Sequence, residues 1–246
     1  FGVIWYDMRN DGDGICDTGA GTLDCNNEIY FARVSAGGTV IGSDLRVTWN
    51  SNSSNFPSLA WSGSEFGVAW RDDRDGNGEI YFRRISFEGS LVGPDIRVSF
   101  DGNDSEEPDL VWNDFGFGVS WQDNRDSNDE IYFAQLSPEG VKLGPDLRVT
   151  QDPASSISPS LAWSGTYVGV TWQENRDTND EIYFALIECD NDGDGLFRED
   201  ETLAATDPDN WDTDNDGISD SDELNLYDTD PVSDDSDGDG LTDWDE

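Results

Sequence analysis

The segment Glu79-Ile80-Tyr81-Phe82 decides the fold, because the chain repeats it at a fixed interval. The same four residues begin at positions 28, 79, 130 and 181, so the interval is 51 residues each time. A period near 50 built from short aromatic and β-branched runs is typical of β-propeller blades. The repeat therefore predicts that residues 1–188 form a series of similar blades.

Each period holds four strand-like runs, separated by gaps rich in Gly, Asn, Asp, Ser and Pro. In the second period these runs are 58–61, 66–70, 79–85 and 95–99. Four short antiparallel strands per repeat match a blade, whereas 51 residues are too few for the alternative, a string of β-sandwich domains. The first period lacks its opening strand and the last its closing strand. We expect that closing strand to come from sequence upstream of Phe1.

The first period also contains an insertion that holds two of the three cysteines. Cys16 and Cys25 bracket this Gly- and Asp-rich stretch and form a candidate disulfide, which leaves Cys189 over. Disulfides persist outside the cytosol, where calcium is also abundant. The chain has no His, so zinc sites and His-based acid–base catalysis are not expected in this sequence.

A polar loop recurs between the second and third runs of the periods and places Arg74, Arg125 and Arg176 at equivalent positions. In one interpretation the loop is a turn whose Arg pairs with a neighbouring carboxylate. In another, the three Arg belong to a ring that binds an anionic sugar or another carboxylate ligand. A third interpretation takes Asp73-x-Asp75-x-Asn77-Gly78 as the first half of a calcium loop, although Arg84 stands where its Glu is needed.

The repeated Trp-x-Asp-x-Arg ahead of Glu-Ile-Tyr-Phe resembles sialidase-like and related bacterial propeller repeats over residues 1–188. The sialidase Asp-box, Ser-x-Asp-x-Gly-x-x-Trp, is missing from every period, so the resemblance identifies no catalytic residue. An active site also needs different residues in different blades, whereas these blades repeat. We therefore expect a non-enzymatic propeller, with its recurrent Trp residues in the core.

Residues 190–246 contain three copies of Asp-x-Asp-x-Asp-Gly followed by five residues and a Glu. This is the twelve-residue calcium loop: carboxylates at positions 1, 3 and 5, Gly at 6 for a sharp turn, a carbonyl at 7 and a bidentate Glu at 12. The second and third copies add a carboxylate at position 9. The candidate ligands are Asp190, Asp192, Asp194, Leu196, Glu201, Asp212, Asp214, Asp216, Ile218, Asp220, Glu223, Asp235, Asp237, Asp239, Leu241, Asp243 and Glu246. We expect three or more Ca²⁺ ions.

The loops begin 22 and 23 residues apart, which leaves no room for a helix on both sides of each loop, as an EF-hand requires. This spacing and the linkers Thr206-Asp207-Pro208 and Thr229-Asp230-Pro231 resemble the bacterial form of thrombospondin type 3 repeats. The resemblance implies an extracellular or surface-attached stalk ordered by calcium, with little hydrophobic core. Dockerin modules are the alternative, but the third loop and the fixed Glu at position 12 argue against them.

Charge explains why such a segment needs metal. Residues 189–246 hold 23 Asp and Glu against one Arg, a net charge of −22 out of −42 for the chain. Carboxylates about 4 Å apart repel by roughly 1 kcal/mol per pair in water and about 4 kcal/mol at an effective dielectric constant of 20. We expect the segment to be disordered without calcium. Arg198 replaces the carboxylate at position 9 of the first loop, which predicts the weakest site there.

These observations predict an all-β chain: a partial propeller of four-stranded blades over 1–188, then an irregular array of calcium-binding loops over 189–246. The expected function is that of a calcium-binding extracellular or cell-surface protein. Its propeller head would recognise a protein or a glycan, on a stalk made rigid by calcium. The alternative is a glycan-acting, sialidase-like hydrolase whose catalytic residues lie outside this sequence. The acidity excludes nucleic acid as a partner, and no membrane insertion is expected.

Overall fold

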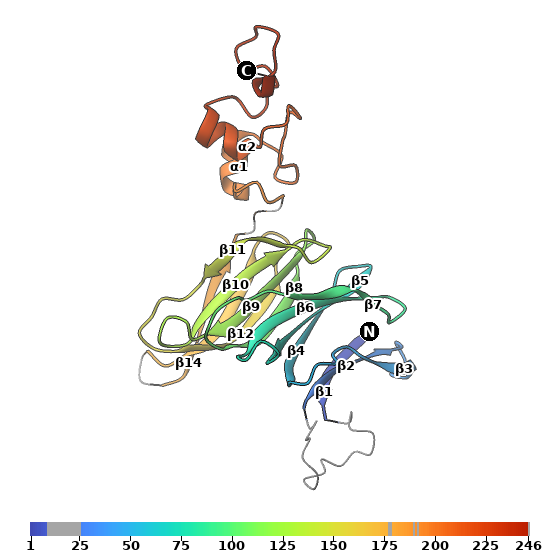
Figure 1. The fold of residues 1–246 in the computed structure, drawn as a ribbon. Helices are drawn as coiled ribbons and strands as arrows, with labels where there is room; N and C mark the ends of the chain where they lie inside the picture. The colour runs from blue at the N-terminus through green and yellow to red at the C-terminus, as the bar shows by residue number, and fades with distance from the viewer. Residues whose placement is uncertain (9–25, 177–178, 189, 191, 246) are drawn as a thin grey trace. The chain divides into compact units, whose positions relative to one another are not determined.

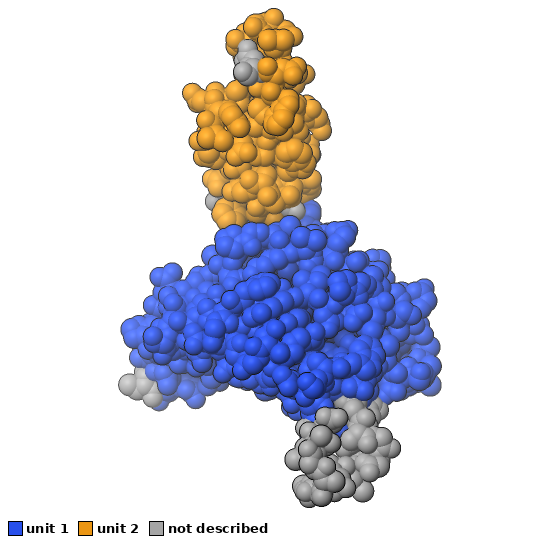
Figure 2. All heavy atoms as spheres, viewed as in Figure 1, with its two compact units in different colours: residues 1–186 blue, residues 187–246 orange. Residues whose placement is uncertain are grey.

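The computed structural model describes residues 1–8, 26–176, 179–188, 190 and 192–245, without the side chains of residues 198 and 199. Cys16, Cys25, Cys189 and Glu246 lie outside the described residues. The chain divides into two compact units, Phe1–Leu186 and Ile187–Glu246, coloured separately in Figure 2. Each unit is described by itself below.

The first unit consists of four antiparallel sheets that follow one another along the chain (Figure 1). In each sheet the strands pair in chain order, as a meander. The first sheet contains β1 (Gly2–Asp7), β2 (Glu28–Val34) and β3 (Val40–Arg46). The second contains β4 (Ser54–Trp61), β5 (Glu65–Asp72), β6 (Glu79–Ser86) and β7 (Leu91–Arg97). The third contains β8 (Ser105–Trp112), β9 (Phe117–Asp123), β10 (Glu130–Leu136) and β11 (Lys142–Arg148). The fourth contains β12 (Ser156–Trp163), β13 (Val168–Glu174) and β14 (Glu181–Ile187).

The sheets pack face to face through aromatic rings that recur with the sequence period. Phe31 of β2 lies 5.0 Å from Phe66 of β5, and Phe82 of β6 lies 5.0 Å from Phe117 of β9, measured between ring centres. Gly67 makes room for the second contact, because a Cβ there would lie 2.4 Å from the Phe117 ring. Buried residues of neighbouring sheets thus form shared apolar clusters. The prediction of an all-β fold made of propeller blades is confirmed.

The first and last sheets have three strands each, as the sequence predicts. In the fourth sheet the apolar face of β14 is open: Ile182 is 72% exposed, Phe184 62% and Leu186 56%. Their counterparts one period earlier, such as Ile131 and Phe133, are buried against neighbouring strands. The fourth strand and the next sheet are what cover this face in a complete blade.

In the second sheet, β4 and β7 differ from the predicted ranges because each contains a bulge. In β7, Gly93, Pro94 and Asp95 stand opposite the single residue Arg83, since pairing shifts between Phe82–Ile96 and Arg84–Val92. Gly93 takes a positive φ of 68°. Pro94 has no backbone N–H, and because β7 is an edge strand, no hydrogen bond of the sheet is lost there. The predicted run 95–99 is therefore displaced from the strand, because β7 spans Leu91–Arg97.

The second unit is built from the three acidic loops and short helical turns. These are α1 (Arg198–Ala204), α2 (Asp220–Asp222) continuing into the π-turn η2 (Glu223–Tyr227), and the 3₁₀-turn η3 (Asp243–Asp245). The sequence predicted only irregular structure here. α1 and η2 end where the chain takes a left-handed backbone conformation, at Ala205 (φ 67°) and Asp228 (φ 62°). Among the described residues, no helix has the length and apolarity of a membrane span.

Packing predicts a clear difference between two glycines of the third sheet region. A Cβ at Gly116 would lie 2.0 Å from the backbone oxygen of Leu136, whereas one at Gly102 would meet nothing within 4 Å. We expect Gly116→Ala to lower the free energy of unfolding by about 2 kcal/mol or more. Gly102→Ala is the control and should change it little. Urea unfolding of both variants checks this; equal stabilities would contradict the packing described here.

Candidate functional site

The recurrent Trp-x-Asp-x-Arg sequence forms one buried polar cluster in each blade. Asp72 is fully buried and accepts hydrogen bonds from the indole N–H of Trp70 (2.9 Å) and the hydroxyl of Ser54 (3.0 Å). The Arg74 guanidinium donates to both oxygens of Asp72 and to Asp95 of β7 (2.8 Å). It also stacks over the ring of Tyr81, 4.2 Å from its centre. The motif therefore joins all four strands of the second sheet, β4 to β7.

The same cluster recurs one and two periods later. Arg125 donates to Asp123 and Asp146 and stacks on Tyr132 at 4.2 Å. Arg176 donates to Glu174 and stacks on Tyr183 at 4.0 Å. The fourth sheet has no fourth strand among its described residues, and Arg176 is the most exposed of the three Arg side chains. The sequence suggested that Arg74, Arg125 and Arg176 could form a ligand-binding ring. In the structure, each of these guanidinium groups binds a carboxylate of its own sheet.

A second buried carboxylate begins each Glu-Ile-Tyr-Phe strand and holds the connection to the next blade. Glu79 accepts from Ser99 (2.5 Å), Arg97 (2.7 Å) and Asn77 (2.8 Å). The Asn77 amide also donates to the backbone oxygens of Asp101 and Asn103, in the connection that leads to β8. Equivalent bonds surround Glu28 and Glu130. We call this cluster the Glu hub.

Opposed effects set the pKa of the Asp clusters. Burial works to raise the pKa of Asp72 and of Asp123, but hydrogen bonds from the neighbouring Arg and Trp side chains outweigh it. The pKa of each carboxyl therefore lies below its ordinary value. These two groups are charged and paired in the folded protein.

The half-loop formed by Asp73, Asp75 and Asn77 does not gather ligands. Asp75 accepts the hydroxyl of Tyr81, and Asn77 belongs to the Glu hub. Among the described residues, triads of carboxylates with oxygens within 4.8 Å of one another occur only in the three C-terminal loops.

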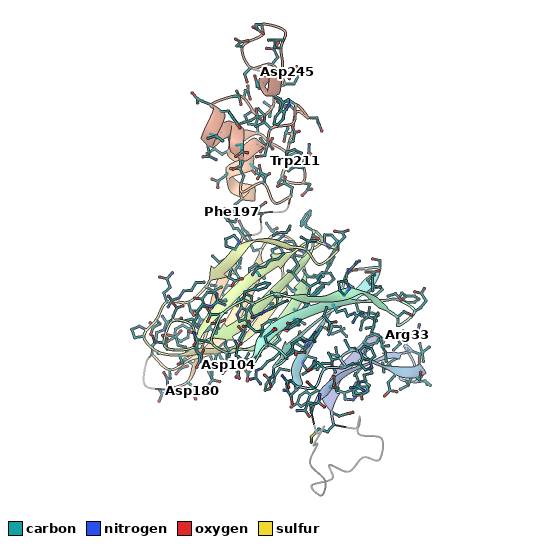
Figure 3. All side chains as sticks on the ribbon, viewed as in Figure 1. Arg33, Asp104, Asp180, Phe197, Trp211 and Asp245 are labelled. Carbon is teal, nitrogen blue, oxygen red and sulfur yellow. The ribbon has the colours of Figure 1, made fainter. Side chains whose placement is uncertain are left out.

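Each C-terminal loop has the same hydrogen-bond pattern (Figure 3 draws these side chains around the labelled Trp211 and Asp245). In the second loop, Asp212 accepts the backbone N–H groups of Asn215 (2.7 Å) and Gly217 (3.0 Å). The carboxylate of Asp214 accepts the backbone N–H of Asp216 (3.1 Å). The carboxylate of Asp216 in turn accepts the backbone N–H of Ile218 (2.8 Å). The first and third loops repeat all four bonds. The chain's own N–H groups therefore hold the three Asp of each loop in one orientation.

The left-handed backbone of these loops explains the Gly at position 6. Gly195, Gly217 and Gly240 have φ values of 105°, 107° and 96°. Such values are strained for any residue with a Cβ.

The position-12 glutamates of the first two loops are buried beside their Asp triads. Glu201 is 1% exposed and Glu223 0%. Among the described residues, one carboxylate oxygen of each has no hydrogen-bond partner, and the same holds for Oδ2 of Asp192 and of Asp214. Buried polar atoms without partners are rare in proteins and call for an explanation. Helical turns position these glutamates: Glu201 lies within α1, and Glu223 begins η2.

Burial and mutual repulsion raise the pKa of these groups. Burial comes first, and the neighbouring carboxylates add to it. The pKa is raised to about 7 for Glu201 and for Glu223, and to about 6 for Asp192 and for Asp214. The pKa of these carboxyl groups is raised, whereas that of Asp72 and Asp123 in the blades is lowered. The difference arises because the described side chains of these loops include no cation.

The other candidate ligands take different places. The carboxylates at position 9, Asp220 and Asp243, bind the residue at position 2: Asp220 accepts from the N–H and hydroxyl of Thr213, and Asp243 does the same with Ser236. The Arg198 side chain and Glu246 lie outside the described structure. Side chains at position 7 are buried for Leu196 and Ile218, and Leu241 is 51% exposed.

No protein-family model and no curated protein matches this chain. Solved structures do resemble it. An α-L-arabinofuranosidase from Lactobacillus brevis is 11% identical, with 70% of this chain and 72% of that chain covered and a TM-score of 0.44. A GH43 endo-arabinanase from Bacillus licheniformis is 13% identical, with 68% and 67% covered and a TM-score of 0.40. A neuraminidase-like protein of A/little yellow-shouldered bat/Guatemala is 11% identical, with 68% and 52% covered and a TM-score of 0.47. At these identities the likeness concerns the fold alone, and no residue's role is carried over.

The matches contradict two expectations from the sequence, the non-enzymatic adhesion or recognition protein and the absence of enzyme activity. The similar structures include an α-L-arabinofuranosidase and a GH43 endo-arabinanase, proteins of the class that the sequence analysis gives as the alternative, a glycan-acting hydrolase. The repetition of the blades misled the sequence-based argument. The Trp, Asp and Arg that recur in every blade hold the strands of each sheet together. Their repetition therefore reflects the scaffold and does not bear on catalysis.

The lowered pKa of Asp123 predicts a pH dependence for the first unit. A carboxyl whose folded pKa is depressed contributes stability above its unfolded pKa of about 3.9 and loses it as the pH falls through the folded value. At pH 7, Asp123→Asn should lower the free energy of unfolding by about 3 kcal/mol. The variant should also lose less stability than the unchanged protein between pH 7 and pH 3.

Urea unfolding at both pH values, followed by Trp fluorescence, measures this. Glu88→Gln, at an exposed turn, is the matched control and should behave like the unchanged protein. An Asp123→Asn variant with unchanged stability at pH 7 would refute the role assigned to this cluster.

Proposed function

We propose that the second unit binds calcium, one ion in each acidic loop, and that the ions are needed for its folding. The observation that carries the proposal is the burial of Glu201 and Glu223 beside the Asp triads, each with an oxygen that finds no hydrogen-bond partner in the part of the chain that the structure describes. A cation at the centre of each triad gives these oxygens a partner.

The donor set fits calcium. All the donors are oxygens, from carboxylates and from the carbonyl at position 7, which suits a hard cation. Their number and the bidentate Glu favour Ca²⁺, which takes six to eight oxygens, over Mg²⁺, which needs strict octahedral geometry. The N–H bonds within each loop hold the carboxylates in place and leave further lone pairs on the same oxygens for the ion. Asp220 and Asp243, which stand at position 9 of their loops, would contact the ion through a water molecule.

Electrostatics supports the same conclusion. Without a cation, the raised pKa values of the buried glutamates record the cost of keeping several carboxylates together. Bound calcium removes this cost, so binding and folding are coupled. The spacing and Pro-containing linkers that resemble thrombospondin type 3 repeats support a structural role for the ions. Extracellular modules of this kind bind calcium at about 10⁻⁴ to 10⁻³ M, and we place the protein outside the cell or at its surface.

Removing one charge at Glu223 tests the calcium proposal. Glu223→Gln keeps the size of the side chain but removes a bidentate anionic ligand, so we expect calcium affinity at the second loop to fall at least about tenfold. The control is Asp222→Asn, which removes an exposed carboxylate from the adjacent residue. Calorimetric titration of the full chain with CaCl₂ measures both. Equal affinities in the two variants, or no binding by the unchanged chain, would refute the proposal.

For the first unit we propose action on glycans, of the hydrolase class. One strand departs from the blade repeat in a way that suits this role. On β8 stand Glu106, Glu107 and Asp109, where β4 and β12 carry uncharged residues. All three are half-buried.

The surroundings of β8 separate the roles of its carboxylates. Asp109 accepts from the hydroxyl of Ser58 (2.8 Å) and the N–H of Leu161 (2.7 Å), so it links three neighbouring first strands. Burial raises the pKa of Glu106, with Arg71 opposing the effect. A carboxyl with a raised pKa suits proton donation, and glycoside hydrolysis uses a pair of carboxyl groups. Glu106 and Glu107 are the side chains we assign to contact a carbohydrate.

Hydrolysis assays test this second proposal. We expect the full chain to release reducing sugar from arabinan or from a sialylated glycan, and Glu106→Gln to lower kcat at least about a hundredfold. Glu139→Gln, in the exposed turn after β10, is the control. No release from either substrate, or equal rates in the two variants, would reject catalysis at β8.

A further inference from the structure

Neighbouring acidic loops are joined by a hydrogen bond that recurs at the same positions. The N–H of Ser221, at position 10 of the second loop, donates to Oδ2 of Asp194, at position 5 of the first loop (2.9 Å). The N–H of Trp244, at position 10 of the third loop, donates to Oδ2 of Asp216, at position 5 of the second loop (3.0 Å). One geometry therefore connects each loop to the next.

The residue that donates this bond also covers the turn of the preceding loop. The Ser221 hydroxyl oxygen lies 3.3 Å from where a Cβ on Gly195 would stand, and the Trp244 ring lies 3.7 Å from the same position on Gly217. The contact falls on position 6, next to the Asp that accepts the bond. The end of one loop thus closes over the centre of the loop before it.

The two oxygens of the position-5 Asp have different donors. In the first loop, Oδ1 of Asp194 accepts from Leu196 of its own loop (2.7 Å), whereas the donor to Oδ2 among the described residues is Ser221. In the second loop, Oδ1 of Asp216 accepts from Ile218 (2.8 Å) and Oδ2 from Trp244. Complete orientation of this ligand therefore requires that the next loop is folded.

We infer that calcium binding is coupled between adjacent loops through the N–H at position 10. This inference rests on the proposed calcium binding. The ion of one loop folds the helical turn at its end, and that turn supplies the donor that orients Asp at position 5 of the preceding loop. Thermodynamic coupling is reciprocal, so each site strengthens its neighbour by the same factor. Among the described residues, no hydrogen bond joins the first loop to the third, and these two communicate only through the second.

Removing one site at a time tests the pattern. In the full ¹⁵N-labelled chain, the backbone resonances of Gly195, Gly217 and Gly240 report calcium binding at each loop separately. Each variant removes the negative charge of two ligands and keeps the position-5 Asp as an acceptor: Asp190→Asn with Asp192→Asn, Asp212→Asn with Asp214→Asn, or Asp235→Asn with Asp237→Asn. Loss of the second site should weaken both other sites about tenfold. Loss of the first should weaken the second about tenfold and the third by a smaller factor, because its effect reaches the third only through the second.

A pair of variants at Ser221 tests the bond itself. Ser221→Pro removes the N–H, and the first turn of a helix accepts Pro because its N–H groups have no partner within the helix. Ser221→Ala keeps the N–H and loses only the hydroxyl. We expect the proline variant to weaken calcium binding at Gly195 about tenfold relative to the alanine variant. A calcium-dependent shift at Gly217 in both variants shows that the second loop still folds.

The outcomes separate the two proposals. No calcium-dependent shift at any of the three glycines in the unchanged chain overturns calcium binding itself. Three sites whose affinities are unaffected by removal of a neighbour overturn the coupling alone. Equal affinities at the first loop in Ser221→Pro and Ser221→Ala would show that the coupling does not pass through this N–H.

Discussion

The need of a buried carboxylate for a partner governs both units of this protein. In the blades, Asp72 is surrounded by an indole, a hydroxyl and a guanidinium, and its pKa is lowered. In the acidic loops, Glu223 has the hydroxyl of Thr229 on one oxygen and no partner on the other, and its pKa is raised. The blades carry their own cations as Arg side chains. The described side chains of the loops include the same type of acid but no cation, and this difference underlies the proposal that they take a cation from solution.

The difference in partners also gives the two units different kinds of stability. Each blade combines apolar contacts such as Phe82 on Phe117 with a polar cluster satisfied by its own side chains. The acidic loops bury few large apolar side chains, chiefly Leu196 and Ile218. A unit with so little apolar surface to bury cannot offset the repulsion among its carboxylates. The proposed calcium binding therefore implies a different kind of stability for each unit: apolar packing and internal ion pairs in the first, and bound ions in the second.

The sequence revealed the repeated features and missed those that depend on backbone geometry. A period of 51 residues predicted the sheets, because each blade must bury the same faces. It did not predict that β7 starts at Leu91, since a bulge at Gly93 and Pro94 resembles a break in the strand. The spacing of the Asp residues located all three triads, but α1 and the bond from Ser221 to Asp194 involve main-chain groups, which have no sequence pattern. The departure at β8 was visible in the sequence, as three acids in one period, and was not recognised.

The Glu hub has a consequence for how such a protein changes length in evolution. Its bonds start at Glu79 and Asn77 in one period and end on the backbone of Asp101 and Asn103, in the connection to the next. A duplication or deletion of one whole period, wherever its ends fall, leaves every hub with its full set of partners. Any other change of length across a connection separates a buried Glu from the amide and the loop that hold it. Tandem gain and loss of whole blades is thus the change in gene length that this scaffold tolerates best.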